Sequence, residues 1–149
     1  MQALNLPLYS FNIQNKGSKK EIFDEIRRCF VVLTPEEWVR QNILKYLVTE
    51  KGFPNGLISI EAGLRVNRLK RRYDGLIYSR QNLPLVLLEC KAPAVSINQA
   101  VFDQIFAYNT SVSAPYLLIT NGMNHFFLKR NAEGKMEFMN TIPEYRELQ

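Results

Sequence analysis

Apolar residues recur with a helical spacing in three parts of the chain. The first part follows Ser18-Lys19-Lys20-Glu21, which has the pattern of a capping box, in which Ser18 and Glu21 would satisfy each other's free backbone N–H groups. One helical face then collects Ile22, Phe23, Ile26, Cys29 and Phe30. This spacing predicts a first helix near the amino terminus.

The second helical stretch begins at Thr34-Pro35-Glu36-Glu37, with Thr34 as the cap, Pro35 at the first helical position and Glu37 completing a second capping box. This helix is predicted to run to about Thr49 and to end at Gly52-Phe53-Pro54. A third helix is predicted after Pro93, where apolar residues recur at intervals of four, four and three: Ile97, Val101, Ile105 and Tyr108.

Short apolar runs between turn residues predict the strands. Three are expected before the third helix, at about 57–66, 73–79 and 85–91, and Asn82-Leu83-Pro84 should join the last two as a hairpin. A buried strand is expected at 116–120, then a final hairpin formed by 125–129 and 136–139 around Ala132-Glu133-Gly134. This order of elements predicts an α/β fold with a mixed sheet rather than a doubly wound one.

The bulk composition is that of one soluble domain spanning residues 1–149, with 46% hydrophobic and 22% charged residues. No apolar run approaches the roughly 20 residues of a membrane span, and Met1–Ser10 lacks the pattern of a secretory signal. Two distant cysteines, Cys29 and Cys90, exclude a disulfide scaffold or a zinc finger. We therefore expect a cytoplasmic protein with no membrane partner.

Two acidic residues and a lysine carry the candidate chemistry. Asp74 lies at the start of one predicted strand, and Glu89 and Lys91 lie at the end of the next, two residues apart. Side chains two residues apart leave the same face of a strand, so Glu89 and Lys91 should point together. Cys90, between them, should face the core, and it is not a candidate nucleophile.

This combination of residues is typical of a divalent-metal site. Mg²⁺ prefers carboxylate oxygens and water, so Asp74 and Glu89 are the expected ligands, with the backbone carbonyl of Cys90 as a third. Lys91 could hold the attacking water or a phosphate group. The single histidine, His125, is expected to be structural.

A basic stretch precedes Asp74 and raises the local positive charge of a chain whose net charge is +5. Such a run can bind phosphates with an affinity that weakens as salt increases. The candidate DNA-binding residues are Arg68, Lys70, Arg71 and Arg72, with Arg65 nearby.

With these residues in place, the sequence resembles a known family. Asp74 with Glu89-Cys90-Lys91 resembles the PD-(D/E)XK nuclease motif, with Tyr73 where the motif's name has proline. Thr34-Pro35-Glu36-Glu37-Trp38-Val39-Arg40-Gln41, Arg72-Tyr73-Asp74 and Glu89-Cys90-Lys91-Ala92-Pro93 resemble the amino-terminal nuclease domain of type I restriction enzyme R subunits. The resemblance spans about residues 22–124.

The resemblance implies a restriction-endonuclease-like core, a mixed β-sheet flanked by helices in αβββαβ order. It also implies a Mg²⁺-dependent DNA endonuclease, with Mn²⁺ as a possible substitute. A Gln-x-x-x-Tyr element is implied as well, here Gln104 and Tyr108 in the third helix, where residues four apart share a face.

Such sites often include an acid from the early helix, and two neighbours compete for that role. At about 100° per residue, Glu36 falls within the inward arc of Val39, Ile43 and Leu47, whereas Glu37 lies off that arc and has a capping role. Glu36 is therefore the expected catalytic acid, with Glu37 and Glu61 as alternatives.

Two further functions stay open. The chain can be a nucleic-acid-binding or assembly module that keeps the nuclease fold without turnover, or a metal-dependent hydrolase of RNA or nucleotides. The given sequence has no Gly-x₄-Gly-Lys-Ser/Thr phosphate loop, so the ATP-driven motor of a full R subunit is not part of it. Three interpretations stay open: a stand-alone homologue, a piece of a longer protein, or the partner of a separate translocase or restriction-complex subunit. A homodimer is also conceivable, because cutting two DNA strands calls for two active sites.

Overall fold

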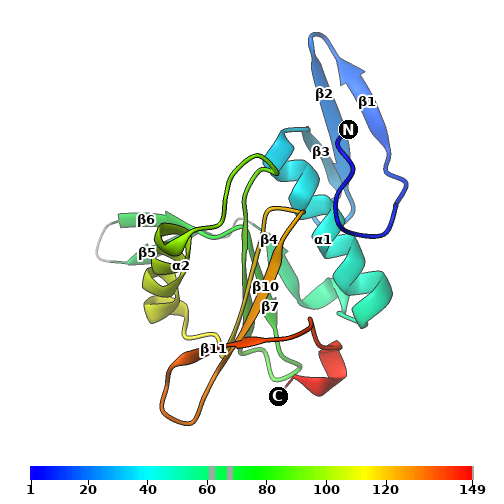
Figure 1. The fold of residues 1–149 in the computed structure, drawn as a ribbon. Coiled ribbons are helices and arrows are strands. Elements are labelled where there is room, and N and C mark those ends of the chain that lie inside the picture. Colours follow the sequence, from blue (N-terminus) through cyan, green and yellow to red (C-terminus); the bar gives the residue numbers. More distant parts are fainter. Residues whose placement is uncertain (61–62, 67–68, 149) are drawn as a thin grey trace.

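The computed structural model describes residues 1–60, 63–66 and 69–148, with the backbone alone between 63 and 72. Glu61 and Arg68, two of the residues singled out in the sequence, lie outside the described residues. The described residues form two long helices and three sheets of three, six and two strands (Figure 1). The fold is therefore mixed α/β, as the sequence predicts.

The six-stranded sheet forms the centre of the molecule, in the order β11-β10-β9-β8-β7-β4. Strands β8 and β9 pair in parallel and every other neighbouring pair is antiparallel, so the sheet is mixed. Its strands are β4 (Ile58–Ile60), β7 (Gly75–Tyr78), β8 (Pro84–Cys90), β9 (Tyr116–Thr120), β10 (His125–Arg130) and β11 (Met136–Met139).

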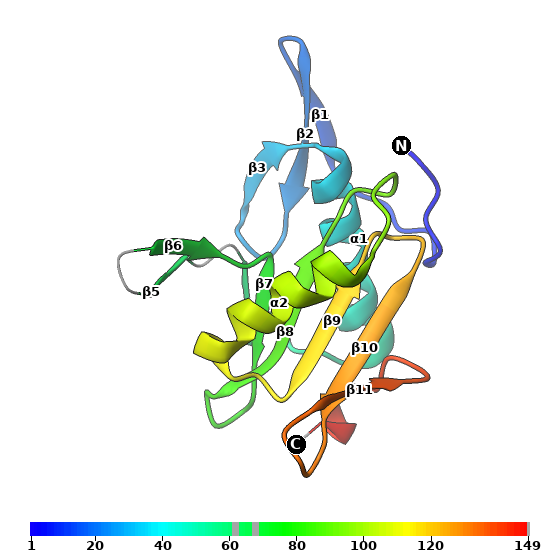
Figure 2. The ribbon, with the colours of Figure 1, turned by 60° about the vertical axis from the view of Figure 1, so that its left-hand side comes forward.

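One helix covers each face of this sheet (Figures 1 and 2). Helix α1 (Pro35–Lys51) packs Val39, Ile43 and Leu47 against one face, and α2 (Gln99–Val112) packs Val101 and Ile105 against the other. The alternation of β8 divides its side chains between the two cores, with Leu88 and Cys90 on the α1 side and Leu87 on the α2 side.

Local signals in the sequence explain where α1 begins and ends. The Thr34 hydroxyl accepts from the Glu37 N–H at 3.0 Å, and Gly52, at φ 70°, closes the helix in the left-handed conformation that glycine adopts without strain. The prediction of this helix is confirmed, as are the predictions of α2, β9 and the β7–β8 and β10–β11 hairpins. Two short 3₁₀ segments, Asn55–Leu57 and Tyr145–Glu147, complete the described helical structure.

The prediction of a helix at the amino-terminal end is wrong. Residues 13–32 form a separate antiparallel sheet of β1 (Ile13–Lys16), β2 (Lys19–Asp24) and β3 (Cys29–Val32). Phe23 and Phe30, seven residues apart and therefore on one face of a helix, are instead cross-strand partners whose ring centroids lie 5.2 Å apart. Residues seven apart lie on one face of a helix, but in a hairpin of this length they are also cross-strand partners. The spacing alone therefore could not distinguish a helix from a hairpin.

The strand predicted at 57–66 is divided. Only β4 joins the central sheet, whereas β5 (Gly63–Val66) pairs with β6 (Leu69–Arg72) as a separate two-stranded hairpin that projects from the body (Figure 2). With this hairpin set aside, the order α1, β4, β7, β8, α2, β9 is the αβββαβ order expected from the sequence. No helix in the described part of the chain is long and apolar enough to cross a membrane.

Candidate functional site

Two adjacent strands bring the predicted acids together at one end of the central sheet. Gly75 of β7 pairs with Leu88 of β8, so Asp74 and Glu89, each one residue further on, lie side by side. The Asp74 Oδ2 atom accepts from the backbone N–H of Cys90 at 2.6 Å, and the charge of Asp74 is close enough to raise the pKa of Glu89. The structure therefore forms the acidic pair that the sequence predicts.

Lys91 completes this cluster on the same side of β8. Its Nζ lies 3.2 Å from Glu89 Oε1, as expected for side chains two residues apart on a strand. Burial alone would lower the pKa of Lys91, but the charge of Glu89 and the hydrogen bond to it raise that pKa instead. Lys91 is therefore a retained positive charge beside the two acids.

Both carboxyl groups of the pair resist ionisation. Burial raises the pKa of Asp74 in spite of the Cys90 hydrogen bond and the charges of Arg40 and Lys91. Burial and the neighbouring charge of Asp74 raise the pKa of Glu89 to about 7, although Lys91 opposes the shift. When both groups are ionised, the pair thus carries more negative charge than the surrounding protein compensates.

A divalent cation fits this donor set, because it would relieve the repulsion between the two acids. Mg²⁺ commonly takes only one or two protein carboxylates and completes its shell with water and substrate phosphates. Within the described residues, no group of three or more His, Cys, Asp or Glu side chains is placed to hold a metal ion. The available set is therefore the pair alone, and the role expected for the Cys90 carbonyl stays a prediction.

Helix α1 places its two glutamates differently from the predicted arc. Glu37 is buried and Glu36 is exposed, the reverse of the burial expected from the spacing. Glu36 nevertheless lies within electrostatic range of the acidic pair, because burial and then the charge of Asp74 raise its pKa while Lys91 lowers it. Its position at the start of α1 keeps Glu36 as a candidate for the site.

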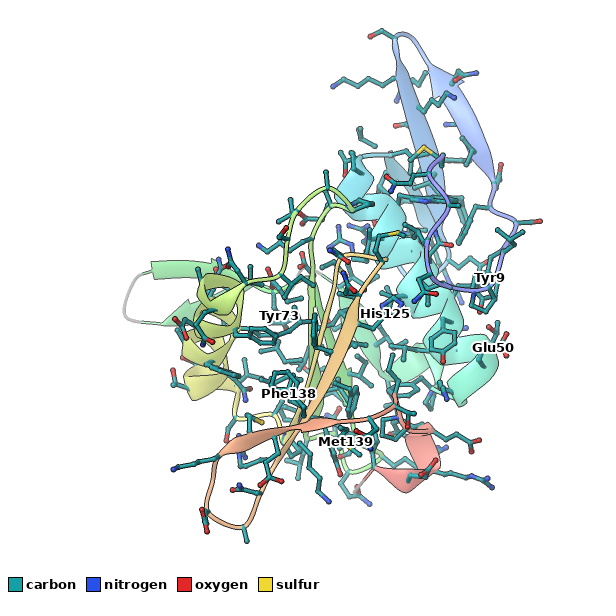
Figure 3. The ribbon with its side chains drawn as sticks, viewed as in Figure 1. Tyr9, Glu50, Tyr73, His125, Phe138 and Met139 are labelled. Carbon is teal, nitrogen blue, oxygen red and sulfur yellow. The ribbon has the colours of Figure 1, made fainter. Side chains whose placement is uncertain are left out.

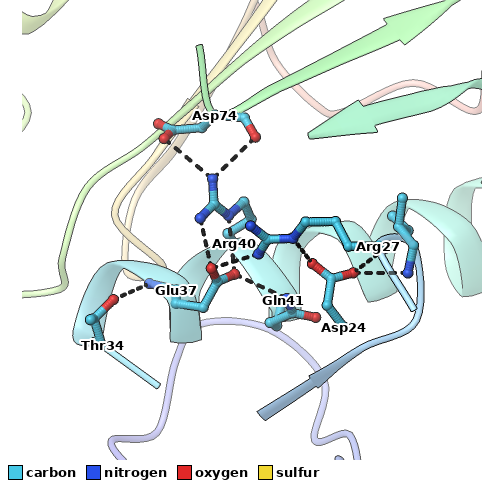
Figure 4. A network of polar contacts seen from close by, with 8 residues as sticks. Asp24, Arg27, Thr34, Glu37, Arg40, Gln41 and Asp74 are labelled. Carbon is cyan, nitrogen blue, oxygen red and sulfur yellow. Dashed lines mark hydrogen bonds and ion pairs between the residues drawn. The ribbon is translucent and has the colours of Figure 1, made fainter. Parts of the chain in front are cut away.

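Glu37 is held in a chain of ion pairs that the sequence reading missed (Figure 4). Its carboxylate accepts from Arg40 at 2.7 and 3.0 Å, from Arg27 at 2.7 Å and from Gln41 at 2.9 Å. Burial alone would raise the pKa of Glu37, but these hydrogen bonds, led by those from Arg40, lower it. With its oxygens so fully bonded, Glu37 is poorly placed to bind a metal ion.

Arg40 connects this chain to the acidic pair. Its Nη1 donates to the backbone carbonyl of Asp74 at 3.3 Å and lies 3.6 Å from the Asp74 Oδ1 atom. At the other end, Arg27 donates to Asp24, whose Oδ1 also accepts the N–H groups of Ile26 and Arg27. The sequence does carry a signal for this burial, because the spacing of four residues of α1 places them on one helical face: Glu37, Arg40, Leu44 and Leu47.

The structure confirms that Gln104 and Tyr108 point together, since Gln104 Nε2 lies 3.4 Å from the Tyr108 hydroxyl. Gln104 is exposed, whereas Tyr108 is half-buried and packs against the core between α2 and the sheet. His125, labelled in Figure 3, is structural in its contacts, with Nδ1 2.7 Å from the Thr120 hydroxyl and Nε2 2.8 Å from the carbonyl of Asn5. Lys70, Arg71 and Arg72 lie in β6, where only the backbone is described.

Comparison with known proteins agrees with this geometry. Residues 35–143, more than half of the chain, match the family described as the type I restriction enzyme R protein N terminus (HSDR_N). The chain therefore belongs to this family. A search of curated proteins returned no match.

A solved structure supports the fold. It is a fragment from Vibrio vulnificus YJ016, described as a candidate HsdR subunit of a type I restriction enzyme. The two share 21% sequence identity with a TM-score of 0.58, over 78% of the present chain and 24% of the other. The chain thus spans about a quarter of that protein, and at this identity the likeness establishes the fold alone.

Proposed function

We propose that this chain is a Mg²⁺-dependent DNA endonuclease domain of the PD-(D/E)XK type. The observation that carries the proposal is the acidic pair of Asp74 and Glu89, with raised pKa values and with Lys91 on the same side of the strand. An excess of buried negative charge beside a lysine is costly for folding alone, and metal-assisted cleavage of a phosphodiester needs both. Mn²⁺ is expected to substitute for Mg²⁺.

Each residue of the cluster has a proposed role. Asp74 and Glu89 would hold the ion, which when bound supplies charge to stabilise the phosphate and lowers the pKa of water. Lys91 would orient the water or the scissile phosphate through its ammonium group. Glu36 would add charge at the exposed edge, and Gln104 and Tyr108 would contact the DNA backbone.

DNA is the proposed substrate, and the basic stretch before Asp74 is its proposed contact through Arg68, Lys70, Arg71 and Arg72. In line with the length of the related protein, a translocase or another restriction-complex subunit is a proposed partner. A homodimer would supply the second active site needed to cut both strands.

Two measurements test the proposal in turn. Titration with Mn²⁺ should show binding to the natural protein that is lost in Asp74→Asn and Glu89→Gln. Nicking of supercoiled plasmid in Mg²⁺ should then fall at least about 10²-fold in Lys91→Ala, the size of effect that follows loss of one charge-stabilising group. Equal nicking by the natural protein and Lys91→Ala would contradict the proposed endonuclease activity.

The second candidate is a module that binds nucleic acid without cutting it. It is favoured by the small donor set, because the described residues offer two carboxylates where a more complete site would offer three. DNA binding that is unchanged by Asp74→Ala and Lys91→Ala, in a protein that does not nick DNA, would support this candidate.

A further inference from the structure

The tip of the β1–β2 hairpin is a small and strongly basic surface. Lys16 and Lys19 are directly opposite each other at the turn, Lys20 follows, and all three side chains are exposed. Residues 13–20 include no acid, and none of these lysines forms an ion pair with any described residue. The tip therefore presents three positive charges to solvent.

Fold stability does not account for this arrangement. Like charges directly opposite each other on neighbouring strands are unfavourable, and here they are placed at Lys16 and Lys19. All four residues of β1 are exposed, and only Ile22 and Asp24 of β2 are buried. Figure 1 shows the hairpin extending well beyond the body of the molecule, so its tip adds nothing to the core.

The base of the hairpin, in contrast, is tied to the candidate site. Asp24 ends β2 and binds Arg27, Arg27 binds Glu37, and Arg40 joins Glu37 to Asp74 (Figure 4). Three of the side chains in this series are almost fully buried: Asp24, Glu37 and Arg40. This chain of ion pairs restrains the direction of the hairpin relative to the acidic pair.

The reach of the hairpin suits a nucleic-acid duplex. The strand from Lys19 to Asp24 extends roughly 17 Å from its first to its last residue at about 3.3 Å per step, which is about half of a DNA helical turn. A duplex that lies across the acidic pair would therefore present backbone phosphates near the tip. Compact ammonium groups on flexible stems bind phosphates without reading sequence.

We propose that the β1–β2 hairpin is a DNA-binding arm in which Lys16, Lys19 and Lys20 grip backbone phosphates of a duplex positioned at the acidic pair. The choice of DNA as the partner rests on the proposed function. The arm itself lies outside residues 35–143, the part of the chain that matches the family. It would act together with the basic β5–β6 hairpin, which projects in a different direction (Figure 2).

The test compares two variants of the whole chain that lose the same charge. Lys16→Ala/Lys19→Ala/Lys20→Ala removes the arm's lysines, and Lys51→Ala/Lys129→Ala/Lys135→Ala removes three lysines from other elements. Binding of a short DNA duplex is measured by fluorescence anisotropy in EDTA over a series of salt concentrations. For three lost phosphate contacts, affinity at low salt should fall roughly 10²-fold and the salt slope should fall by about 2–3.

The control variant should lose much less affinity and keep most of the salt slope. Equal losses in the two variants, or no binding of DNA by the natural protein, would overturn the proposal that the hairpin is a DNA-binding arm. Unchanged DNA binding in the arm variant, together with lost binding to anionic vesicles or to a second copy of the chain, would assign the lysines to another partner and overturn it too. Because EDTA removes the metal, the Mn²⁺ titration and the nicking assay report on the endonuclease separately.

Discussion

Glu37 and Glu89 are two glutamates of nearly equal burial, 4% and 7% exposed, whose surroundings shift their pKa values in opposite directions. The carboxylate of Glu37 receives hydrogen bonds from two arginines and an amide, which lower its pKa against the effect of burial. Glu89 lies beside another acid and has one lysine within 3.2 Å, and burial together with the charge of Asp74 raises its pKa to about 7.

The difference lies in how much compensating charge the protein itself supplies to each glutamate. Each acid of the ion-pair chain has arginine partners within the protein, so nothing further is required to stabilise it. The acidic pair shares one lysine and lies beside one arginine at 3.6 Å, so an incoming cation would gain a favourable site. Burial alone therefore does not distinguish the two glutamates, whereas the amount of compensating charge around each of them does.

The largest effect is expected for a substitution in the chain of ion pairs around Glu37. Arg40→Met removes a buried cation that serves both Glu37 and Asp74, and it should lower the free energy of unfolding by about 3–5 kcal/mol, because the remaining acids stay buried without their partner. Urea denaturation measures this loss. The matched control is Arg146→Met, whose side chain is 83% exposed and whose pairing with Glu144 contributes little. Equal losses in the two variants would show that the ion-pair chain is not structural.

The raised pKa of Glu89 is tested by measuring the stability of the metal-free protein over a series of pH values. The pKa of Glu89 is about 7 in the folded state and near its ordinary 4.5 when unfolded, so the folded protein holds the extra proton between those values. Stability from this group is therefore complete below about pH 4.5 and is lost as the pH rises through 7, by about 3 kcal/mol.

Glu89→Gln should remove this pH dependence and should make the metal-free protein more stable than the natural one at alkaline pH. Thermal or urea unfolding in EDTA from mildly acidic to mildly alkaline pH measures both curves. Glu37, whose pKa is lowered, changes its contribution only at more acidic pH, so it does not mask the result. Parallel curves for the two proteins would contradict the raised pKa.

The smallest effect is expected for Glu36→Gln, which tests whether Glu36 belongs to the proposed metal site. Because this side chain is exposed, Glu36→Gln should change the free energy of unfolding by no more than about 0.5 kcal/mol. One charge close to a bound ion contributes about 1 kcal/mol in water, so Mn²⁺ affinity should fall about fivefold. Glu25→Gln, an exposed acid paired with Lys45, is the control and should leave Mn²⁺ affinity unchanged. No difference between the variants would remove Glu36 from the site.

Sequence patterns located the acidic pair because its elements follow from local chemistry. Strands β7 and β8 are joined by a short turn in which Asn82 takes a positive φ of 64°, and such a connection pairs neighbouring strands. Once the pair of strands is expected, the alternation of side chains places Glu89 and Lys91 on one face. The helix α1 was equally predictable from its cap, its first-turn proline and its closing glycine.

The same reasoning failed where residues distant in sequence decided the outcome. The capping-box sequence at Ser18 is compatible with a helix, but pairing with β3 and the contact of Phe23 with Phe30 favour a hairpin. The burial of Glu37 likewise depends on Arg27, which reaches it from the turn after β2. A spacing rule applied to one helix cannot include a partner from another element.

The sequence alone thus determined the mixed α/β order from α1 onward and the proximity of Asp74, Glu89 and Lys91, because caps, turns and strand alternation act over a few residues. Only the tertiary structure decided which glutamate of α1 is buried, and it revealed that Arg40 joins the amino-terminal sheet to the acidic pair. The physical reason is that the pKa and the pairing of a buried charge depend on all the groups packed around it, and those groups come together only in the folded chain.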